Sequence, residues 1–313
     1  MPMISPRPLR IWQLGDRRLE LGRRTLLMAI LNLTPDSFYP ASRLPPDAVV
    51  EAAEAALAAG ADLLDLGAES TRPAAEPLPP PQEQARLLPA LERLRRRFPQ
   101  IPLSVDTRHG ETARAALAAG ADIINDVSGL ADPVMLATAA GAGCGLVLMH
   151  LRGCFATMHR LPPLADPVDE VTRGFRALLA RARAAGIAAD RIVLDPGFGF
   201  GKNLGENFPL LARFDSWHAF GRPLLAGVSR KSFIGYALAA PPSPAAPPSP
   251  PVPGASPQLP PPDARLYGSL AAVTAAILNG AHLVRVHDVA AARDAARVAD
   301  AILAANPVES PAG

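Results

Sequence analysis

The sequence predicts a (β/α)8 barrel, and two observations indicate this fold. Short apolar runs that end in a polar residue alternate with longer segments of helical periodicity along most of the 313 residues. One unit also recurs: ALAAGADLLD at 56–65 returns as ALAAGADIIN at 116–125, with a looser copy, ILNGAHLVR, at 277–285. Each copy is typical of an Ala-rich helix that ends at Gly before an apolar strand. Strands that alternate with helices imply a parallel sheet.

The elements follow in order along the chain. A hairpin is expected at 11–25, where it would close the bottom of the barrel. We expect eight strands, at 26–32, 62–67, 101–106, 122–126, 145–150, 191–195, 223–228 and 282–287. Helices fit at 47–59, 82–97, 109–119, 132–140, 168–185, 205–213, 266–279 and 289–304. A doubly wound open sheet is the alternative, but eight regular units favour closure.

One segment departs from this rhythm. Residues 240–263 are almost wholly Pro, Ala and Ser, a composition typical of an extended, mobile loop without helix or sheet pairing. We interpret it as an insertion between the seventh strand and the following helix, although a partner-binding role is an alternative. The chain is expected to form a single domain, 1–313, with its core at about 25–305.

Composition excludes several classes of protein. The net charge is +2 and no basic block is interleaved with aromatic residues, so nucleic acid is not an expected partner. Apolar runs are broken before they could span a bilayer, and the first residues lack the apolar core of a signal peptide. Cys144 and Cys154 have no zinc-site or disulfide spacing. We therefore expect a soluble, cytoplasmic protein.

Polar residues end every expected strand. Because active sites of such barrels form at the carboxyl ends of the strands, these residues should share one mouth. They are Asn32, Asp65 with Glu69 nearby, Asp106, Asn125 with Asp126, His150, Asp195, Ser229 to Lys231, and Arg285 with His287. Carboxylates, amides and a lysine suit a flat heterocycle with donors and acceptors on its edge. Arg285 and His287 are two apart on one strand, and so could clamp an anion such as phosphate.

The lysines deserve separate notice because the chain holds only two, Lys202 and Lys231, among 31 basic residues. Where arginine is the usual cation, a surviving lysine indicates a site that needs a compact ammonium. Both follow apolar, strand-like runs in segments rich in turn residues. The loops 32–38 and 69–73 carry small polar residues and suit lids that exclude water from the mouth.

At these positions the chain resembles the dihydropteroate synthase family. The resemblance covers all eight strand ends in order, from about residue 25 to 305. The matching segments are NLTPDSF (32–38), ESTRP (69–73), SVDT (104–107), IINDVSG (123–129), LMH (148–150), DPGFGFGKN (195–203), GVSRKSFIG (227–235), RLYGSLAA (265–272) and VRVHDV (284–289).

The resemblance implies that 4-aminobenzoate displaces diphosphate from 6-hydroxymethyl-7,8-dihydropterin diphosphate, giving 7,8-dihydropteroate in folate synthesis. It also implies Mg²⁺ on Asn32, competition by sulfonamides, and a homodimer. The pterin would lie on Asp106, Asn125, Asp195 and Lys231, with Met149 and Phe200 lining the pocket. Diphosphate would meet Asn32, Arg285 and His287. The residues implied for 4-aminobenzoate are Phe38, Thr71, Arg72, Pro73 and Ser229.

The sequence departs from the family pattern in three loops. Tyr39-Pro40-Ala41-Ser42 stands where the family usually has Ser-Asp-Gly-Gly, Ala74-Ala75 replaces Gly-Ala, and 151–158 matches only loosely. Two alternatives therefore stay open: the pterin-binding barrel of a methyltetrahydrofolate methyltransferase, and a non-catalytic paralogue that binds pterin or a protein partner. Lys231→Ala is expected to weaken pterin binding strongly, and Lys202→Arg to matter less.

Overall fold

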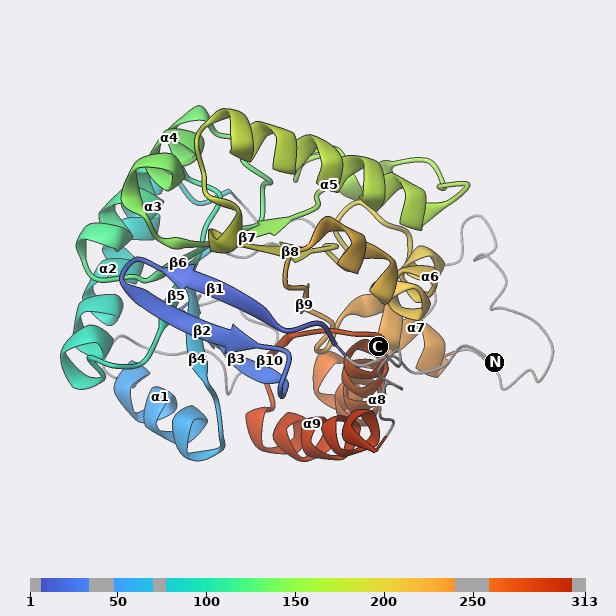
Figure 1. Cartoon of the computed structure of the whole chain (residues 1–313). Coiled ribbons are helices and arrows are strands. Elements are labelled where there is room, and N and C mark those ends of the chain that lie inside the picture. Colours follow the sequence, from blue (N-terminus) through green and yellow to red (C-terminus); the bar gives the residue numbers. More distant parts are fainter. Residues whose placement is uncertain (1–6, 34–47, 70–76, 240–258, 306–313) are drawn as a thin grey trace, which may run out of the picture.

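A closed ring of parallel strands forms the centre of the protein (Figure 1). The structure is a computed structural model that describes residues 7–33, 48–69, 77–239 and 259–305. The strands are β3 (Leu26–Asn32), β4 (Leu63–Gly67), β5 (Leu103–Asp106), β6 (Ile123–Asp126), β7 (Gly145–Met149), β8 (Ile192–Asp195), β9 (Leu225–Ala226) and β10 (Leu283–Val286). They are hydrogen-bonded in the order β8-β7-β6-β5-β4-β3-β10-β9, and a parallel bridge between Leu194 and Leu224 closes the ring. The predicted barrel is confirmed.

Helices surround this ring. They are α1 (Val49–Ala58), α2 (Pro80–Arg97), α3 (Gly110–Ala118), α4 (Pro133–Ala142), α5 (Pro167–Ala184), α6 (Asn207–Ala212), α7 (Ser232–Ala239), α8 (Leu266–Leu278) and α9 (Val289–Ala304). Local chemistry sets where several begin. In α4 and α5 an Asp caps the first backbone N–H groups and Pro follows at the first helical position.

Two expectations need correction. The sequence reading placed no helix at 232–239, where α7 forms, and it assigned six residues at 223–228 to a strand that extends over only two, Leu225–Ala226. Most of the Pro-rich segment, 240–258, lies outside the described residues. The end of this segment was expected to contain no helix, but Pro262–Arg265 forms a 3-10 turn that leads into α8.

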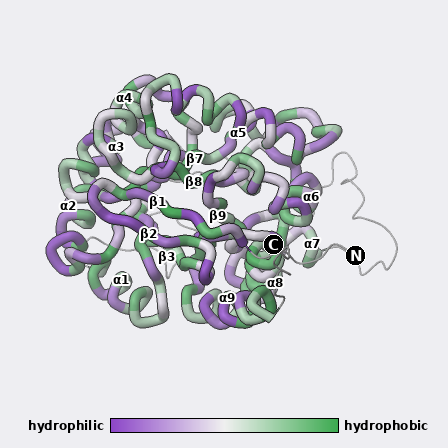
Figure 2. Tube along the Cα trace, in the orientation of Figure 1, coloured by the Kyte–Doolittle hydropathy of each residue, from purple (hydrophilic) through white to green (hydrophobic). Residues whose placement is uncertain are grey.

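The bottom of the barrel is closed by an antiparallel hairpin of β1 (Arg10–Leu14) and β2 (Arg17–Leu21), as predicted. Trp12, Leu14 and Leu21 are buried against the inward-facing residues at the base of the strands. The indole Nε1 of Trp12 donates to the carbonyl of Arg191, 2.8 Å away, so its one polar group is paired. The larger core lies between strands and helices, and Figure 2 colours α8 as largely hydrophobic.

The repeated unit has a structural reason. The residue that follows Gly-Ala in each copy accepts a backbone N–H from a neighbouring strand. Asp62 accepts from Leu27 N at 2.8 Å, Asp122 from Leu103 N at 2.8 Å, and the Nδ1 of His282 from Leu224 N at 3.1 Å. The pattern in the sequence is therefore a repeated side-chain acceptor that fixes where adjacent strands begin pairing.

Arginines from neighbouring helices cover the glycines of the first two copies. Both glycines have positive φ at a helix end, and an added Cβ would lie 2.9 Å from the side chain above it. Arg293 covers Gly60 and donates to Ala59 O at 3.1 Å, while the Nε of Arg95 donates to Gly120 O at 2.9 Å. Cations thus meet the carbonyl ends of helices at the floor of the barrel.

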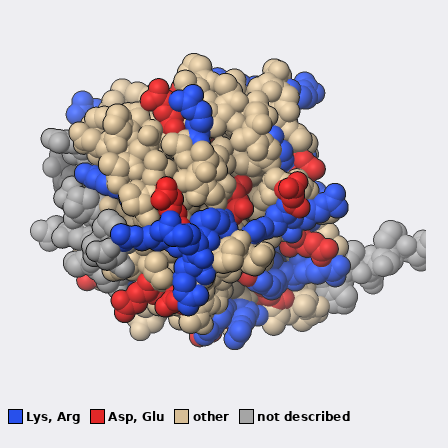
Figure 3. Space-filling model, turned by 90° about the vertical axis from the view of Figure 1, so that its left-hand side faces the viewer, with Lys and Arg blue, Asp and Glu red and all other residues tan. Residues whose placement is uncertain are grey.

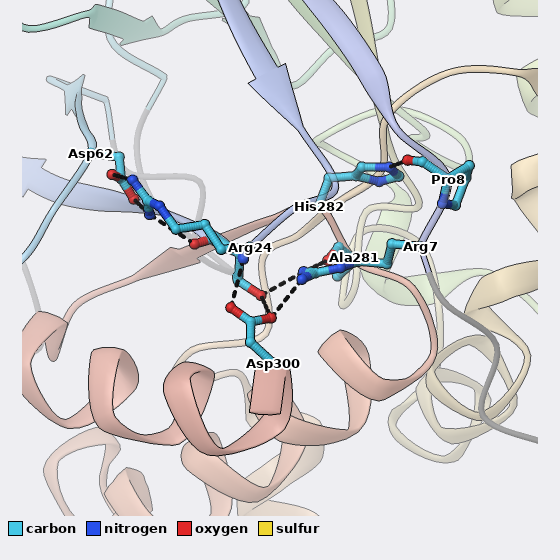
Figure 4. Close-up of polar contacts among 8 residues, drawn as sticks. Arg7, Pro8, Arg24, Asp62, Ala281, His282 and Asp300 are labelled. Atoms are coloured by element: carbon cyan, nitrogen blue, oxygen red, sulfur yellow. Dashed lines mark hydrogen bonds and ion pairs between the residues drawn. The ribbon is translucent and has the colours of Figure 1, made fainter. Parts of the chain in front are cut away.

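The first described residues are attached to the same floor (Figure 4). Arg7 donates to the hydroxyl of Thr25 at 2.6 Å, to Ala281 O at 2.8 Å and to the carboxylate of Asp300 at 2.5 Å. Asp300 also accepts from the backbone and hydroxyl of Thr25, both at 2.8 Å. This network joins the N-terminal segment, the start of β3 and α9.

Charged side chains of both signs lie on the described surface. Figure 3 shows basic and acidic side chains interspersed on the side that carries α1 to α3. Within the basic run at the end of α2, Arg95 pairs with Asp122 and Arg97 with Glu54. Among the described residues, no helix is both long and apolar enough to cross a membrane.

His282 makes folding stability depend on pH. Its side chain is fully buried, its Nδ1 accepts from Leu224 N, and its Nε2 lies 2.9 Å from Pro8 O, so the neutral ring is satisfied on both sides. Burial lowers its pKa from 6.5 to about 3. The unfolded chain takes up this proton below its ordinary pKa and the folded chain does not. The stabilisation is therefore complete above that pKa and is lost as pH falls toward the folded value.

We predict that His282→Gln, which keeps a donor and an acceptor but cannot titrate, removes this dependence. The difference in unfolding free energy between wild type and variant should shrink by roughly 1 kcal/mol between pH 6 and pH 5. Urea unfolding at several pH values measures it. A difference that stays constant over that interval contradicts the role given to His282.

Candidate active site

The carboxyl ends of the strands bring most of the predicted site residues together. The register of the sheet places Gly67 beside Asp106, Asp106 beside Asn125, and Met149 beside Asp195. Because neighbouring parallel strands run in register, a polar residue at each end produces a continuous polar rim. The rim described here contains Asn32, Asp65, Asp106, Asn125, Asp195, Ser229, Lys231, Arg285 and His287.

A buried ion pair lies at the centre of this rim. The carboxylate of Asp65, which has no exposed surface, accepts from Arg285 Nε at 2.6 Å, from Ser104 Oγ at 2.5 Å and from Asn125 Nδ2 at 3.2 Å. The sequence analysis placed Asp65 at the mouth but assigned it no ligand. A signal was present, since the repeat aligns Asp65 with Asn125.

Arg285 bridges two carboxylates. Its Nε binds Asp65, and its Nη2 donates to Asp106 Oδ2 at 2.6 Å. Burial alone would lower the pKa of this guanidinium, but the two carboxylates raise it above its ordinary value. The pKa of Asp106 is raised by burial and by the nearby charge of Asp65, although Arg285 and Lys231 oppose the shift. Two of the guanidinium nitrogens are thus engaged, and among the described residues Nη1 has no hydrogen-bond partner, so this nitrogen could bind an anion.

Asp195 and Lys231 form the other side of the rim. Asp195 is 7% exposed, and its Oδ1 accepts from Gly197 N at 2.7 Å. Burial raises the pKa of Asp195. The Lys231 ammonium lies 4.2 Å from the ring centroid of Phe200, and burial lowers the pKa of this lysine to about 8. Phe200 packs with Met149 in a small apolar cluster, so the two predicted lining residues do lie together.

Arg230, which lies between the predicted binding residues Ser229 and Lys231, has an unusual backbone conformation. Its φ is +60°, a left-handed value that non-glycine residues rarely adopt. Three contacts support it: its side chain pairs with Asp288, its N–H donates to Ser269 Oγ at 2.9 Å, and its carbonyl accepts from Arg265 Nη1 at 2.9 Å. On the near side Ser229 Oγ lies 3.0 Å from His287 Nδ1.

Three strand-end residues do not join the rim as expected. The carboxylate of Asp126 binds the backbone of Ser128 and Leu130 and fixes the turn after β6. The ring of His150 packs on the backbone of Gly174 in α5, where burial lowers its pKa to about 2. Glu69 binds Arg108 rather than facing the central acids. Strand residues alternate between two buried faces, so a polar strand end alone does not reveal the face it occupies.

Lys202 is structural. It is 7% exposed, and its ammonium donates to the carbonyls of His150, Pro196 and Gly197 at 2.9, 2.6 and 2.9 Å. Burial lowers its pKa to about 7. Three carbonyls that converge on one rotatable ammonium explain why lysine stands here in an arginine-rich chain. The lysine fastens the loop after β8 to the end of β7 through these carbonyls.

Asn32 offers the expected metal position. A Cβ added at Gly67 would lie 3.9 Å from the Asn32 amide oxygen and 3.8 Å from Asp106 Oδ2, so this amide borders the mouth. No group of three or more His, Cys, Asp or Glu that could hold a metal occurs in the described part of the chain. A lone oxygen ligand still fits Mg²⁺, which keeps several waters and is often completed by substrate phosphates. The predicted residues Phe38, Thr71, Arg72 and Pro73 lie outside the described residues.

Comparison with known proteins identifies the family. The sequence model described as "Pterin binding enzyme" matches residues 28–287. Dihydropteroate synthase of Escherichia coli strain K12 is 41% identical over 282 residues, covering 89% of this chain and 92% of its own length. This chain belongs to the dihydropteroate synthase family.

Solved structures agree with the sequence match. A Yersinia pestis dihydropteroate synthase with a sulfonamide drug complex has a TM-score of 0.84 at 37% identity, covering 94% of this chain and 99% of its own. The Xanthomonas albilineans dihydropteroate synthase with 4-aminobenzoic acid has a TM-score of 0.81 at 39% identity, with 95% and 99% covered. The resemblance predicted from the strand-end motifs is therefore confirmed, and the chain is a transferase of the dihydropteroate synthase family.

We predict that Lys202→Arg lowers the unfolding free energy by about 1–3 kcal/mol, because a larger planar head must enter a filled site. Urea denaturation measures the loss. Arg96→Lys, at an exposed position on α2, is the control and should stay within about 0.5 kcal/mol of wild type. An unchanged denaturation midpoint for Lys202→Arg would contradict the structural role.

Proposed function

We propose that the protein makes 7,8-dihydropteroate at this rim, by joining the pterinylmethyl group of 6-hydroxymethyl-7,8-dihydropterin diphosphate to 4-aminobenzoate in folate biosynthesis. The observation that carries the proposal is the convergence of Asp106, Asn125, Asp195, Lys231 and Arg285 on one edge of the barrel. The related dihydropteroate synthase of Xanthomonas albilineans has solved structures with 4-aminobenzoic acid and with 7,8-dihydropteroate.

The pterin is held by hydrogen bonds along its edge. A flat ring with an N–C–N edge presents N–H donors, and the carboxylates of Asp106 and Asp195 can accept hydrogen bonds from them. The amide of Asn125 can both donate and accept. Lys231 donates to an acceptor on the same ring. Burial of both acids in a rim of low dielectric strengthens each of these bonds, and Met149 and Phe200 supply the apolar wall.

Diphosphate leaves toward the ends of the neighbouring strands β10 and β3. Arg285 and His287 lie there beside Asn32, and Arg285 is anchored by two carboxylates, so its charge is fixed in position before the substrate arrives. Asn32 would hold Mg²⁺, which when bound neutralises charge on the diphosphate. The residues at this side therefore stabilise the departing anion.

The chemistry needs no strong base. The bond from the pterinylmethyl carbon to the diphosphate oxygen breaks, and its electron pair leaves with diphosphate. The electron-rich pterin delocalises the resulting positive charge, and the carboxylates of Asp106 and Asp195 lie near it. The amine of 4-aminobenzoate then forms the new C–N bond and gives its proton to solvent. Water must be kept from the cation, and the loops 32–38 and 69–73 are proposed to do so.

The remaining assignments rest on the family resemblance. The proposed 4-aminobenzoate site comprises Phe38, Thr71, Arg72, Pro73 and Ser229, where sulfonamides would compete. The chain is proposed to act in the cytoplasm as a homodimer. Exposed apolar side chains on α7 and α8, Leu238 at 49% and Tyr267 at 83%, support contact with a second copy.

We predict that purified protein with dihydropterin diphosphate, 4-aminobenzoate and Mg²⁺ forms dihydropteroate and releases one diphosphate for each product. Liquid chromatography of the pterin and an assay for diphosphate measure both. Pterin binding without any product would indicate the non-catalytic paralogue instead. Methyl transfer from methyltetrahydrofolate would indicate the other barrel class.

We predict that Lys231→Ala weakens binding of the pterin at least about tenfold, because it removes a charge-assisted hydrogen bond from a desolvated site. Calorimetric titration with 6-hydroxymethylpterin measures the affinity. Lys202→Arg is the control and should bind within about threefold of wild type, since the Lys202 ammonium is engaged by three backbone carbonyls. Near-normal affinity in Lys231→Ala would count against the assigned pterin site.

A further inference from the structure

The loop after β7 contains a hydrogen-bonded turn, although its sequence matches the family only loosely. Thr157 N and Met158 N both donate to Cys154 O, at 3.0 and 2.8 Å, and form a tight turn. Arg152 Nη1 donates to Pro162 O at 2.7 Å and joins the two ends of the loop. Met158 is 4% exposed and anchors the turn in the apolar cluster of the rim. Phe155 therefore lies in a segment with a defined conformation.

Phe155 extends the apolar wall of the pterin pocket. It packs against the buried cluster that contains Met149 and Phe200, the two residues expected to line that pocket. Its ring meets Phe200 edge to face, with centroids 6.3 Å apart and an interplanar angle of 84°. This is the favoured geometry of an aromatic pair, so the two rings form two sides of one corner.

Arg108 holds Phe155 from the other side. Its guanidinium carbon lies 5.3 Å from the Phe155 ring centroid, within cation–π range. The same guanidinium pairs in a fork with Glu69, through Nε and Nη2 at 2.8 Å each. Its side chain is 24% exposed and that of Glu69 9%, so the pair is largely shielded from water. Arg108 is thus fixed in orientation and offers one flat face to Phe155.

These contacts form one continuous row of side chains that begins at the rim and extends beyond it. It runs from Lys231 to Phe200, Phe155, Arg108 and Glu69, and it joins the loops that follow β9, β8, β7, β5 and β4. Lys231 and Arg108 each face an aromatic ring, and the two rings contact each other between them. Such a row gives a flat heterocycle an aromatic corner and excludes water from its outer side.

We propose that Phe155 is a binding residue of the pterin pocket in this chain, and that Arg108 is a positioning residue that keeps its ring in place. The proposal rests on the proposed function, because it assigns the occupant of the pocket as a dihydropterin. It adds the loop after β7 to the site, with a residue that the family motifs do not contain. Arg108 acts through Phe155 and does not itself contact the pterin.

The binding test uses the full-length protein and 6-hydroxymethylpterin as the calorimetric probe. Phe155→Ala should weaken binding about tenfold, as removal of an aromatic partner does for a stacked base, while Phe155→Tyr should restore affinity to within about twofold. In steady-state assays the KM for dihydropterin diphosphate should rise more than kcat falls. Phe155→Ala binding as tightly as wild type would overturn the proposal.

The positioning role is tested with Arg108→Met, which removes the charge and keeps the length. Alone, it should weaken binding of the probe about threefold. In the Phe155→Ala background it should weaken binding little further, because the effects of coupled residues are not additive. Arg114→Met, an exposed arginine on α3, is the matched control and should change nothing. If the affinity losses of the two single variants simply add in the double variant, the role of Arg108 is refuted.

Failure of the proposed function would look different. In that case wild-type protein would neither bind the probe nor form dihydropteroate, and no comparison among variants would be needed. An active wild type with unaffected Phe155 variants would instead leave the function intact and remove Phe155 from the pocket. Thermal unfolding of each variant checks that the fold is retained.

Discussion

The ion pair between Asp65 and Arg285 is the interaction on which the rim depends. The two residues stand on β4 and β10, the strands that flank β3, so they can meet only because the sheet brings those strands to the same edge. A buried pair is stable only if its other hydrogen-bonding atoms are also satisfied. Here Ser104 and Asn125 also bind the carboxylate, and Asp106 binds a second nitrogen of the guanidinium. One contact set therefore fixes acids, an amide and a cation that come from distant parts of the chain.

Much of this could be predicted from the sequence, for reasons that particular residues make clear. The acceptors at Asp62 and Asp122 recur because in each unit a side chain accepts a backbone N–H from the neighbouring strand. That repetition in the sequence revealed the fold. Strand-end polarity located the rim. It could not separate Asp106, which faces the mouth, from His150, which faces α5, because both faces of these strands are buried and no alternation marks them. The role of Asp65 was missed because its partners lie on other strands.

The two lysines show the same limit. Each was predicted to need a compact ammonium, and the structure places the two in different surroundings. Lys231 faces Phe200 at the rim, whereas Lys202 donates hydrogen bonds to three backbone carbonyls. Residue choice indicates a geometric demand, and only coordinates show whether the demand comes from a ligand or from the backbone. The helix at 232–239 was missed because Gly235 and the nearby turn residues resemble a continuing loop.

The arginine contacts at the floor have an evolutionary consequence. Arg293 and Arg95 bind helix ends far from the rim, and Arg7 attaches the N-terminal segment to the same layer. The layer that holds the scaffold together is thus separate from the layer that meets substrates. Substitutions such as those at 151–158 can accumulate in the loops of the upper layer while the lower layer preserves foldability. A barrel organised in this way can acquire new ligand contacts, Phe155 among them, by drift in its loops alone.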